Sequence, residues 1–257
     1  MQKYYYLIHI QFLGFRYHGW LKQPKVKTVQ SMIEKTITFI LGNGDFKTMG
    51  CSRTDSKVSA NQFAFELFTK TEMDDNFFEE LNHNLPGDIK ALKIEEVDKK
   101  FSIINNPKVK EYLYLFSFGE KAHPFSAPLM HVCQDSLNIE AMKDGANLYK
   151  GIHSFKKYCT KPKPGTNFVR EILECEIIQN DIFKANFFPE TSFLLRIHGK
   201  GFLRYQVRLI MGQLLSLGRG EINLNDIKKS LIGDDEEPLR YIAPSSGLIL
   251  NKVKFDI

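Results

Sequence analysis

An arginine and an aspartate lie one residue apart in the segment CSRTDSKVSANQFAFEL, residues 51–67. The second half of this segment alternates apolar and polar residues, which is typical of a half-buried strand. A carboxylate beside cations stays ionised even in a partly buried cleft, where it can act as a nucleophile or a base. Asp55 is therefore a candidate catalytic residue, with Arg53 beside it. An ordinary solvated turn explains the same residues, because Asp and Ser in turns commonly bond to the backbone.

A pair of arginines marks a second candidate region, in the segment HGKGFLRYQVRLIMG, residues 198–212. On a predicted helix, Arg204 and Arg208 share one face at the border of an apolar arc. A guanidinium so close to a hydrophobic core is costly unless a carboxylate meets it. An arginine that lays its stem on the core and extends its charge into water explains the pattern as well. The residues alone leave both interpretations open.

Basic and aromatic residues alternate in YKGIHSFKKYCTKPKPGTNFVREI, residues 149–172. Such a mixture can hold a nucleic-acid backbone and stack on its bases, although a solvated lysine-rich loop is equally compatible with it. In the strand-like segment KEYLYLF, residues 110–116, Tyr112 and Tyr114 fall on one face of the sheet. That face is either part of the core or a platform for a ligand.

The composition favours a polyanionic partner. The 257 residues include 35 Lys and Arg against 30 Asp and Glu, for a net charge of +5. The four cysteines form no C-x-x-C pair and have no nearby histidine spacing suited to zinc, so we expect reduced thiols and no metal. No signal-peptide layout, membrane-length apolar run, phosphate-binding loop or dinucleotide motif is present. We expect a cytoplasmic protein without a membrane segment or a small-molecule cofactor.

Hydrophobic periodicity predicts two α+β subdomains, residues 1–104 and 105–257, each with the strand and helix order of the split βαβ, or ferredoxin-like, arrangement. The Asn-Asn-Pro turn near residue 105 marks the boundary. Thr28 is the expected first cap of a helix that Gly42 ends. The predicted strands are 4–12, 46–51, 62–68, 91–97, 111–118, 169–179, 192–198 and 248–255. The predicted helices are 28–41, 74–85, 139–149, 202–217 and a short one from 226.

Several stretches together resemble the TruA family of tRNA pseudouridine synthases. The segment SRTDSKVSA resembles the family signature R-T-D-x-G-V-[HS]-A, and NLPGDI matches as it stands. The other matching stretches, in the family's order along the chain, are FLGFRYHGWLKQP, TVQSMIEK, YKGIHSF, VREI and GFLRYQVRLIMG. Such a set of motifs in register is far more specific than the R-T-D signature alone.

The resemblance implies an isomerase that converts uridine to pseudouridine in tRNA without a cofactor or metal. In this interpretation Asp55 attacks the ribose or removes a proton from it, and Arg53 helps to hold the flipped nucleotide. Tyr112 stacks on the flipped base and can take the proton from its carbon 5, and Arg208 pairs with Asp55. The residues predicted to bind RNA are Arg53, Lys57, Lys110, Lys156, Lys157, Arg170 and Arg204.

The resemblance also implies a pseudouridine synthase fold with an extended, mostly antiparallel sheet and a central basic cleft. It further implies a homodimer that acts on the anticodon stem-loop, at tRNA positions 38–40. Four departures from the family pattern stand out: Leu21, Lys57, Ser59 and Ile104. Lys57 replaces a glycine, which is costly if the position needs a positive φ. The alternative hypothesis is therefore that this protein is a catalytically idle, RNA-binding relative of such enzymes. A third hypothesis, a regulatory module that binds a small metabolite, rests on fold analogy alone.

Overall fold

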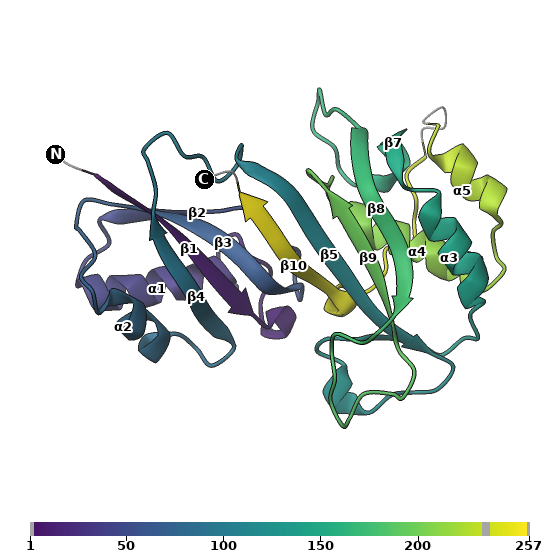
Figure 1. Cartoon of the computed structure of the whole chain (residues 1–257), viewed down its shortest axis with the longest axis horizontal. Coiled ribbons are helices and arrows are strands. Elements are labelled where there is room, and N and C mark those ends of the chain that lie inside the picture. Colours follow the sequence, from purple (N-terminus) through teal and green to yellow (C-terminus); the bar gives the residue numbers. More distant parts are fainter. Residues whose placement is uncertain (1–2, 233–236, 256–257) are drawn as a thin grey trace. The chain divides into compact units, whose positions relative to one another are not determined.

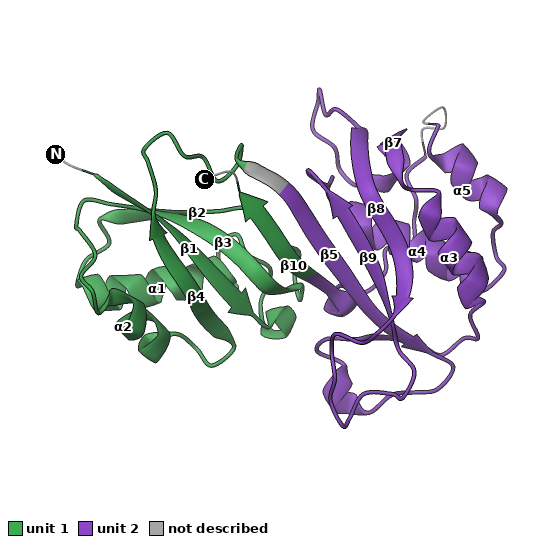
Figure 2. Cartoon of the chain, viewed as in Figure 1, with its two compact units in different colours: residues 1–108, 250–257 green, residues 109–249 purple. Residues whose placement is uncertain are grey.

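A computed structural model describes residues 3–232 and 237–255. The chain forms two compact units, which we describe separately (Figure 2). Unit 1 comprises residues 1–108 and 250–257, and unit 2 comprises residues 109–249. The predicted subdomains were continuous in sequence, whereas contacts group the C-terminal residues with unit 1. The reason is that the last strand lies next to a strand of the first unit.

Unit 1 contains a sheet covered by two helices (Figure 1). Its elements are β1 (Tyr4–Phe12), α1 (Val29–Leu41), β2 (Phe46–Gly50), β3 (Ser59–Thr69), α2 (Phe77–Asn84), β4 (Ile89–Glu96) and β10 (Leu248–Phe255). The strands follow the order β4-β1-β3-β10, and β2 also pairs with β3. The pairs β1–β3, β1–β4 and β2–β3 are antiparallel. The β-α-β-β-α-β order predicted for residues 4–97 is confirmed.

Helix α1 begins and ends where the sequence predicts. The side chain of Thr28 accepts a hydrogen bond from the Ser31 amide. In return, the Ser31 hydroxyl accepts a hydrogen bond from the Thr28 backbone amide. This reciprocal cap satisfies amides that no helical carbonyl can reach. Gly42 ends the helix with φ 67°, a left-handed conformation that glycine adopts without steric cost. The inner face of α1 buries Ile33 and Ile37 almost completely.

In the described part of unit 2, three α-helices lie on a mixed sheet (Figure 1). Its elements are β5 (Pro107–Phe118), β6 (His131–Cys133), α3 (Ile139–Asn147), β7 (Gly151–Ser154), β8 (Val169–Gln179), β9 (Phe193–Gly199), α4 (Gln206–Gly218) and α5 (Leu224–Ser230). The strand order is β5-β9-β8-β7, with β6 parallel to β5. The protein is therefore an α+β protein, as predicted. The tandem ferredoxin-like arrangement stays a prediction.

The elements of unit 2 differ from the predicted ones in two ways. Helix α4 was predicted from residue 202, but it begins at Gln206, because Tyr205 has φ 63° and is not helical. Strands β6 and β7, of three and four residues, were not predicted. Strands this short carry too little alternation to be recognised in a sequence.

Candidate active-site loop and basic surface

The loop between β2 and β3 presents Asp55. It runs from Cys51 to Val58, and the Val58 amide donates to the Asp55 carbonyl at 3.2 Å. Asp55 is half-buried, whereas Arg53 is exposed. The loop is therefore a tight turn at the start of β3, as the sequence predicts, with its carboxylate partly shielded from water and its arginine in solvent.

A second segment, residues 14–20, holds this loop from one side. The carbonyl of Tyr17 accepts hydrogen bonds from the Lys57 amide at 3.0 Å and from the Ser56 hydroxyl at 3.3 Å. The Trp20 amide donates to the Thr54 carbonyl at 3.4 Å. These bonds span both sides of Asp55 along the chain, so the conformation of the loop depends on the position of the segment 14–20.

Two glycines permit this close approach. A Cβ on Gly14 would lie 1.9 Å from the Val58 carbonyl oxygen, and one on Gly19 would lie 2.3 Å from that of Thr54. Both distances are impossible for real atoms without a shift of backbone. The spacing of the two glycines in the segment LGFRYHGW therefore follows from the need to pack one backbone against another.

Lys57 has φ 66°, so a left-handed conformation occurs at the position where the family signature has glycine. Its ammonium lies 5.5 Å from the centre of the Phe15 ring. A Cβ in this conformation costs about 1 to 2 kcal/mol. We expect Lys57→Gly to raise the free energy of unfolding by about 0.5 to 1 kcal/mol, the larger entropy of unfolded glycine offsetting part of the gain.

Urea denaturation measures that difference. Lys57→Ala is the matched control, since it removes the ammonium and keeps the strained Cβ. A glycine variant no more stable than the alanine variant would show that the conformation is not strained.

Tyr112 lies in β5, opposite Ile197 of β9, and is 7% exposed. Its ring meets Phe202 edge to face, with 5.3 Å between the centres. Tyr114, on the same face, is fully buried and donates to the Pro244 carbonyl at 2.7 Å. Of the two tyrosines, Tyr114 is thus a core residue, and Tyr112 lies at the edge of this core.

Arg208 is half-buried on the first turn of α4. Its Nε donates to the Ala243 carbonyl at 2.8 Å, and its guanidinium carbon lies 5.0 Å from the centre of the Tyr205 ring. The Ala243 amide donates in turn to the Arg208 carbonyl at 3.1 Å. The guanidinium is therefore oriented within unit 2 by backbone and by an aromatic face. Arg204 is exposed and lies over the same tyrosine ring at 5.2 Å.

The structure brings several predicted RNA-binding residues of unit 2 together around Cys159. The Thr160 amide, directly after Cys159, donates to the Arg204 carbonyl at 3.4 Å, and Arg170 of β8 pairs in register with His153 of β7. Burial raises the pKa of the Cys159 thiol, while a backbone hydrogen bond from Arg204 and the charges of Arg170 and Arg204 act in the opposite direction. Lys156 and Lys157 precede Cys159 on a single 3₁₀ turn. We call these four basic residues, Lys156, Lys157, Arg170 and Arg204, the basic cluster. Lys110 lies elsewhere on β5, opposite Gly199.

The sequence interpretation missed the residues that hold the segment 14–20. Asp88 accepts hydrogen bonds from the Tyr17 hydroxyl and the Arg16 guanidinium. Its motif, NLPGDI, was interpreted only as a match to the family. The aspartate directly after Pro-Gly was the one feature of the sequence that could have drawn attention to this residue. Nothing in the sequence states that it pairs with residues about 70 positions earlier.

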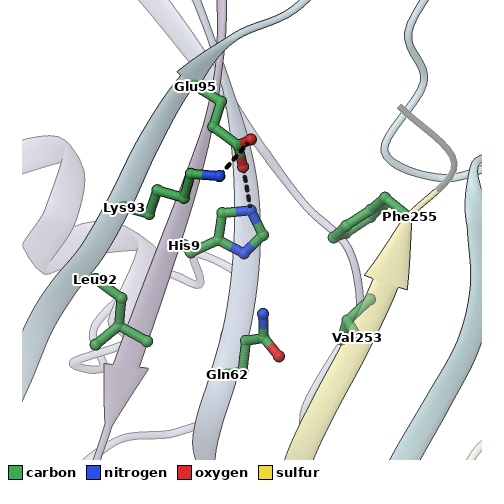
Figure 3. A pocket seen from close by; sticks show the side chains of 7 residues that line it. All are labelled: His9, Gln62, Leu92, Lys93, Glu95, Val253 and Phe255. Atoms are coloured by element: carbon green, nitrogen blue, oxygen red, sulfur yellow. Dashed lines mark hydrogen bonds and ion pairs between the residues drawn. The ribbon is translucent and has the colours of Figure 1, made fainter.

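Figure 3 shows a pocket of about 360 Å³ in unit 1, lined by residues that the sequence did not single out. A ring nitrogen of His9 lies 3.1 Å from a Glu95 carboxylate oxygen, and Lys93 forms an ion pair with the same carboxylate at 2.6 Å. Burial lowers the pKa of His9 despite Glu95. A hydrogen bond from Lys93 lowers the pKa of Glu95, and burial, which acts in the opposite direction, has a smaller effect. No predicted site residue lines this pocket.

Cys51, Cys133, Cys159 and Cys175 are all buried. Within residues 3–232 and 237–255, no three His, Cys, Asp or Glu side chains gather as a metal site would require. None of the helices in that part of the chain is long and apolar enough to cross a membrane.

Comparison with known proteins defines the class. A family model described as tRNA pseudouridine synthase matches residues 146–256. A "tRNA pseudouridine synthase A 2" from Bacillus cereus is 32% identical over 254 residues, covering 97% of this chain and 99% of the relative. A "tRNA pseudouridine synthase A" from Clostridium botulinum is 32% identical, covering 95% and 96%. One from Dictyoglomus thermophilum is 30% identical, covering 96% and 98%.

The chain is thus similar, over nearly its whole length, to tRNA pseudouridine synthases, which are isomerases. Within that class it belongs to the TruA family.

Proposed function

We propose that this protein isomerises uridine to pseudouridine in tRNA, with Asp55 as the catalytic carboxylate. The observation that carries the proposal is the family membership over 97% of the chain, together with an intact Arg-Thr-Asp sequence on the loop before β3. A half-buried carboxylate is suited to the chemistry, because an ionised carboxylate that has lost part of its hydration shell is a competent nucleophile or base.

The reaction needs no external reactant. The Asp55 carboxylate either attacks carbon 1′ of the ribose, displacing uracil with the electron pair of the N-glycosidic bond, or removes a ribose proton to give a glycal. The freed uracil rotates, and its carbon 5 bonds to carbon 1′. On the first route the bond between Asp55 and carbon 1′ breaks in this step and releases the carboxylate, and on the glycal route Asp55 returns the proton to carbon 2′ of the ribose. The hydrogen of carbon 5 leaves as a proton, and N1 of the uracil gains one. Atoms and electrons balance, as an isomerisation requires.

The other predicted site residues have consistent roles in this proposal. Arg53, exposed on the same loop, is suited to hold a nucleotide out of its stack, which costs about a few kcal/mol. Tyr112 would stack on the flipped uracil and take the proton from its carbon 5. Arg208 would pair with the carboxylate, for which the planar fork of N–H donors in a guanidinium is well suited.

The basic cluster is proposed to contact tRNA phosphates. Replacing Arg170 and Arg204 together with alanine should weaken tRNA binding and reduce the slope of log Kd against log salt by about 1 to 2. Filter binding at several salt concentrations measures the slope. Lys143→Ala is the control, because this lysine of α3 is paired with Glu140 at 2.8 Å. Equal slopes for the double variant and the control would show that the basic cluster does not contact tRNA phosphates.

The decisive test of the proposed activity is tritium release from tRNA labelled at carbon 5 of uracil. Folded protein that releases no tritium from unmodified tRNA or other cellular RNA, yet binds tRNA, would be an idle RNA-binding relative. Lys57 and Ile104 motivated that alternative. Lys57 has φ 66°, so the loop accommodates a lysine in the left-handed conformation, and Ile104 is exposed.

Three finer parts belong to the same proposal: action at positions 38–40 of the anticodon stem-loop, a homodimer, and a cytoplasmic location. Sequencing of pseudouridines in cells that lack the protein would identify the sites. Light scattering would give the mass in solution, and fractionation would give the location.

A further inference from the structure

Tyr17 is almost inaccessible to solvent, at 1% exposure, and its hydroxyl contacts a carboxylate. Its hydroxyl donates to Oδ1 of Asp88 at 2.6 Å. The other oxygen, Oδ2, accepts from Arg16 Nε at 2.8 Å. The Leu13 amide donates to the Asp88 carbonyl at 3.0 Å, which attaches the start of the segment 14–20 to the same residue. Asp88 therefore anchors this segment through both side chain and backbone.

The Tyr17–Asp88 bond joins a neutral donor to an ionised acceptor. Burial raises the pKa of Tyr17, and the hydrogen bond to Asp88 raises it further. Burial alone would raise the pKa of Asp88, but hydrogen bonds from Tyr17 and Arg16 more than offset this and lower it. Hydrogen bonds to a charged acceptor are shorter and about twice as strong as neutral ones. The hydroxyl of Tyr17 is thus firmly located.

The backbone of Tyr17 transmits this position to the loop that carries Asp55. Its carbonyl oxygen accepts from the Lys57 amide at 3.0 Å and from the Ser56 hydroxyl at 3.3 Å. These two donors follow Asp55 directly in the chain. Val58 closes the turn by donating to the Asp55 carbonyl at 3.2 Å. One carbonyl therefore connects the anchored tyrosine with the turn in which the carboxylate lies.

We infer that Asp88 and Tyr17 are positioning residues for Asp55: their side-chain hydrogen bond holds the Tyr17 carbonyl where it fixes the 54–58 turn. This inference rests on the proposed function, because it assigns a purpose to the position of Asp55. A displacement of about 1 Å at a reacting group can cost about 100-fold in rate. A hydrogen bond far from the substrate can therefore affect turnover without affecting how tightly tRNA binds.

The test is Tyr17→Phe, which removes one hydroxyl and keeps the buried ring. We expect the single-turnover rate of tritium release to fall about 10- to 100-fold, with Kd for tRNA changed less than about two-fold. The Lys57 amide should exchange its hydrogen faster, because its acceptor is no longer held. Asp88→Asn keeps an oxygen for the Tyr17 hydroxyl and should retain more activity than Asp88→Ala.

Tyr6→Phe is the matched control. Tyr6 is also a buried tyrosine of unit 1, 7% exposed, and its hydroxyl accepts from the Met73 amide at 3.0 Å, away from the Asp55 loop. If the two variants lose activity equally, or if Tyr17→Phe leaves the rate unchanged, the positioning role is wrong. Hydrogen exchange of the Lys57 amide can be measured without turnover. It therefore distinguishes a wrong positioning role from a wrong proposed function. An unchanged exchange rate in Tyr17→Phe would overturn the inference even in an inactive protein.

Discussion

Asp55→Asn is expected to abolish pseudouridine formation while tRNA binding persists. The amide is close to the carboxylate in shape, so the 51–58 loop can keep its hydrogen bonds. It carries no negative charge, so it can neither attack carbon 1′ nor remove a ribose proton. Loss of a catalytic nucleophile or base costs at least about 10³-fold in turnover. Tritium release and filter binding, measured on the same preparation, test both parts.

Asp45→Asn is a suitable control for Asp55→Asn. Asp45 is an exposed carboxylate of unit 1 that pairs loosely with Lys70 at 3.6 Å, so its loss changes the net charge equally without touching the loop. Activity within about tenfold of the unmodified protein in Asp55→Asn would show that another group performs the chemistry. A parallel loss of tRNA binding would indicate that the substitution acts on the fold of the loop.

Gly14→Ala should be the most damaging single methyl addition near the site. The new Cβ would lie 1.9 Å from the Val58 carbonyl oxygen and 2.9 Å from the Ser59 amide nitrogen, and both neighbours are backbone. The start of β3 and the segment 14–20 must then separate. Overpacking of this kind costs about 3 kcal/mol. For a chain of this size we expect Tm to fall by about 6 to 12 °C. Turnover should fall more than about 100-fold, because the loop loses its support.

Gly44→Ala provides the comparison, because a Cβ on Gly44 has no neighbouring atom within 4 Å and its φ is not positive. It should leave Tm and turnover unchanged. Calorimetry gives the first quantity and tritium release the second. If Gly14→Ala is as stable and as active as Gly44→Ala, the close approach of the two backbones does not support the loop.

Much of the fold could be predicted because its signals are local. The strands 4–12, 169–179 and 248–255 have the predicted bounds, and Thr28 and Gly42 cap α1 as expected. The start of α4 was wrong because a left-handed tyrosine leaves no mark in a helical pattern. The grouping of the last strand with unit 1 also escaped prediction, since strand partners distant in sequence are set by the whole sheet.

The sequence singles out the candidate chemical residues, and their roles stay a prediction. The loop around Asp55 lies between two strands, as its composition indicated, and Tyr112 and Arg208 lie on the predicted strand and helix. The support of the loop could not be foreseen, because Tyr17 meets Asp88 and Ser56 across 71 and 39 positions of sequence. Local patterns report which face a residue occupies, and they do not report which remote backbone it will touch.

Strand β10 has a consequence for how the protein is made. It lies beside β3, and Asn251 accepts a hydrogen bond from Asn61 of that strand at 2.7 Å across 190 positions. A growing polypeptide on the ribosome therefore carries an unfinished first unit, with one edge of β3 lacking its β10 partner, until almost all of unit 2 has been synthesised. The half of the molecule that bears Asp55 begins translation first and completes its sheet last.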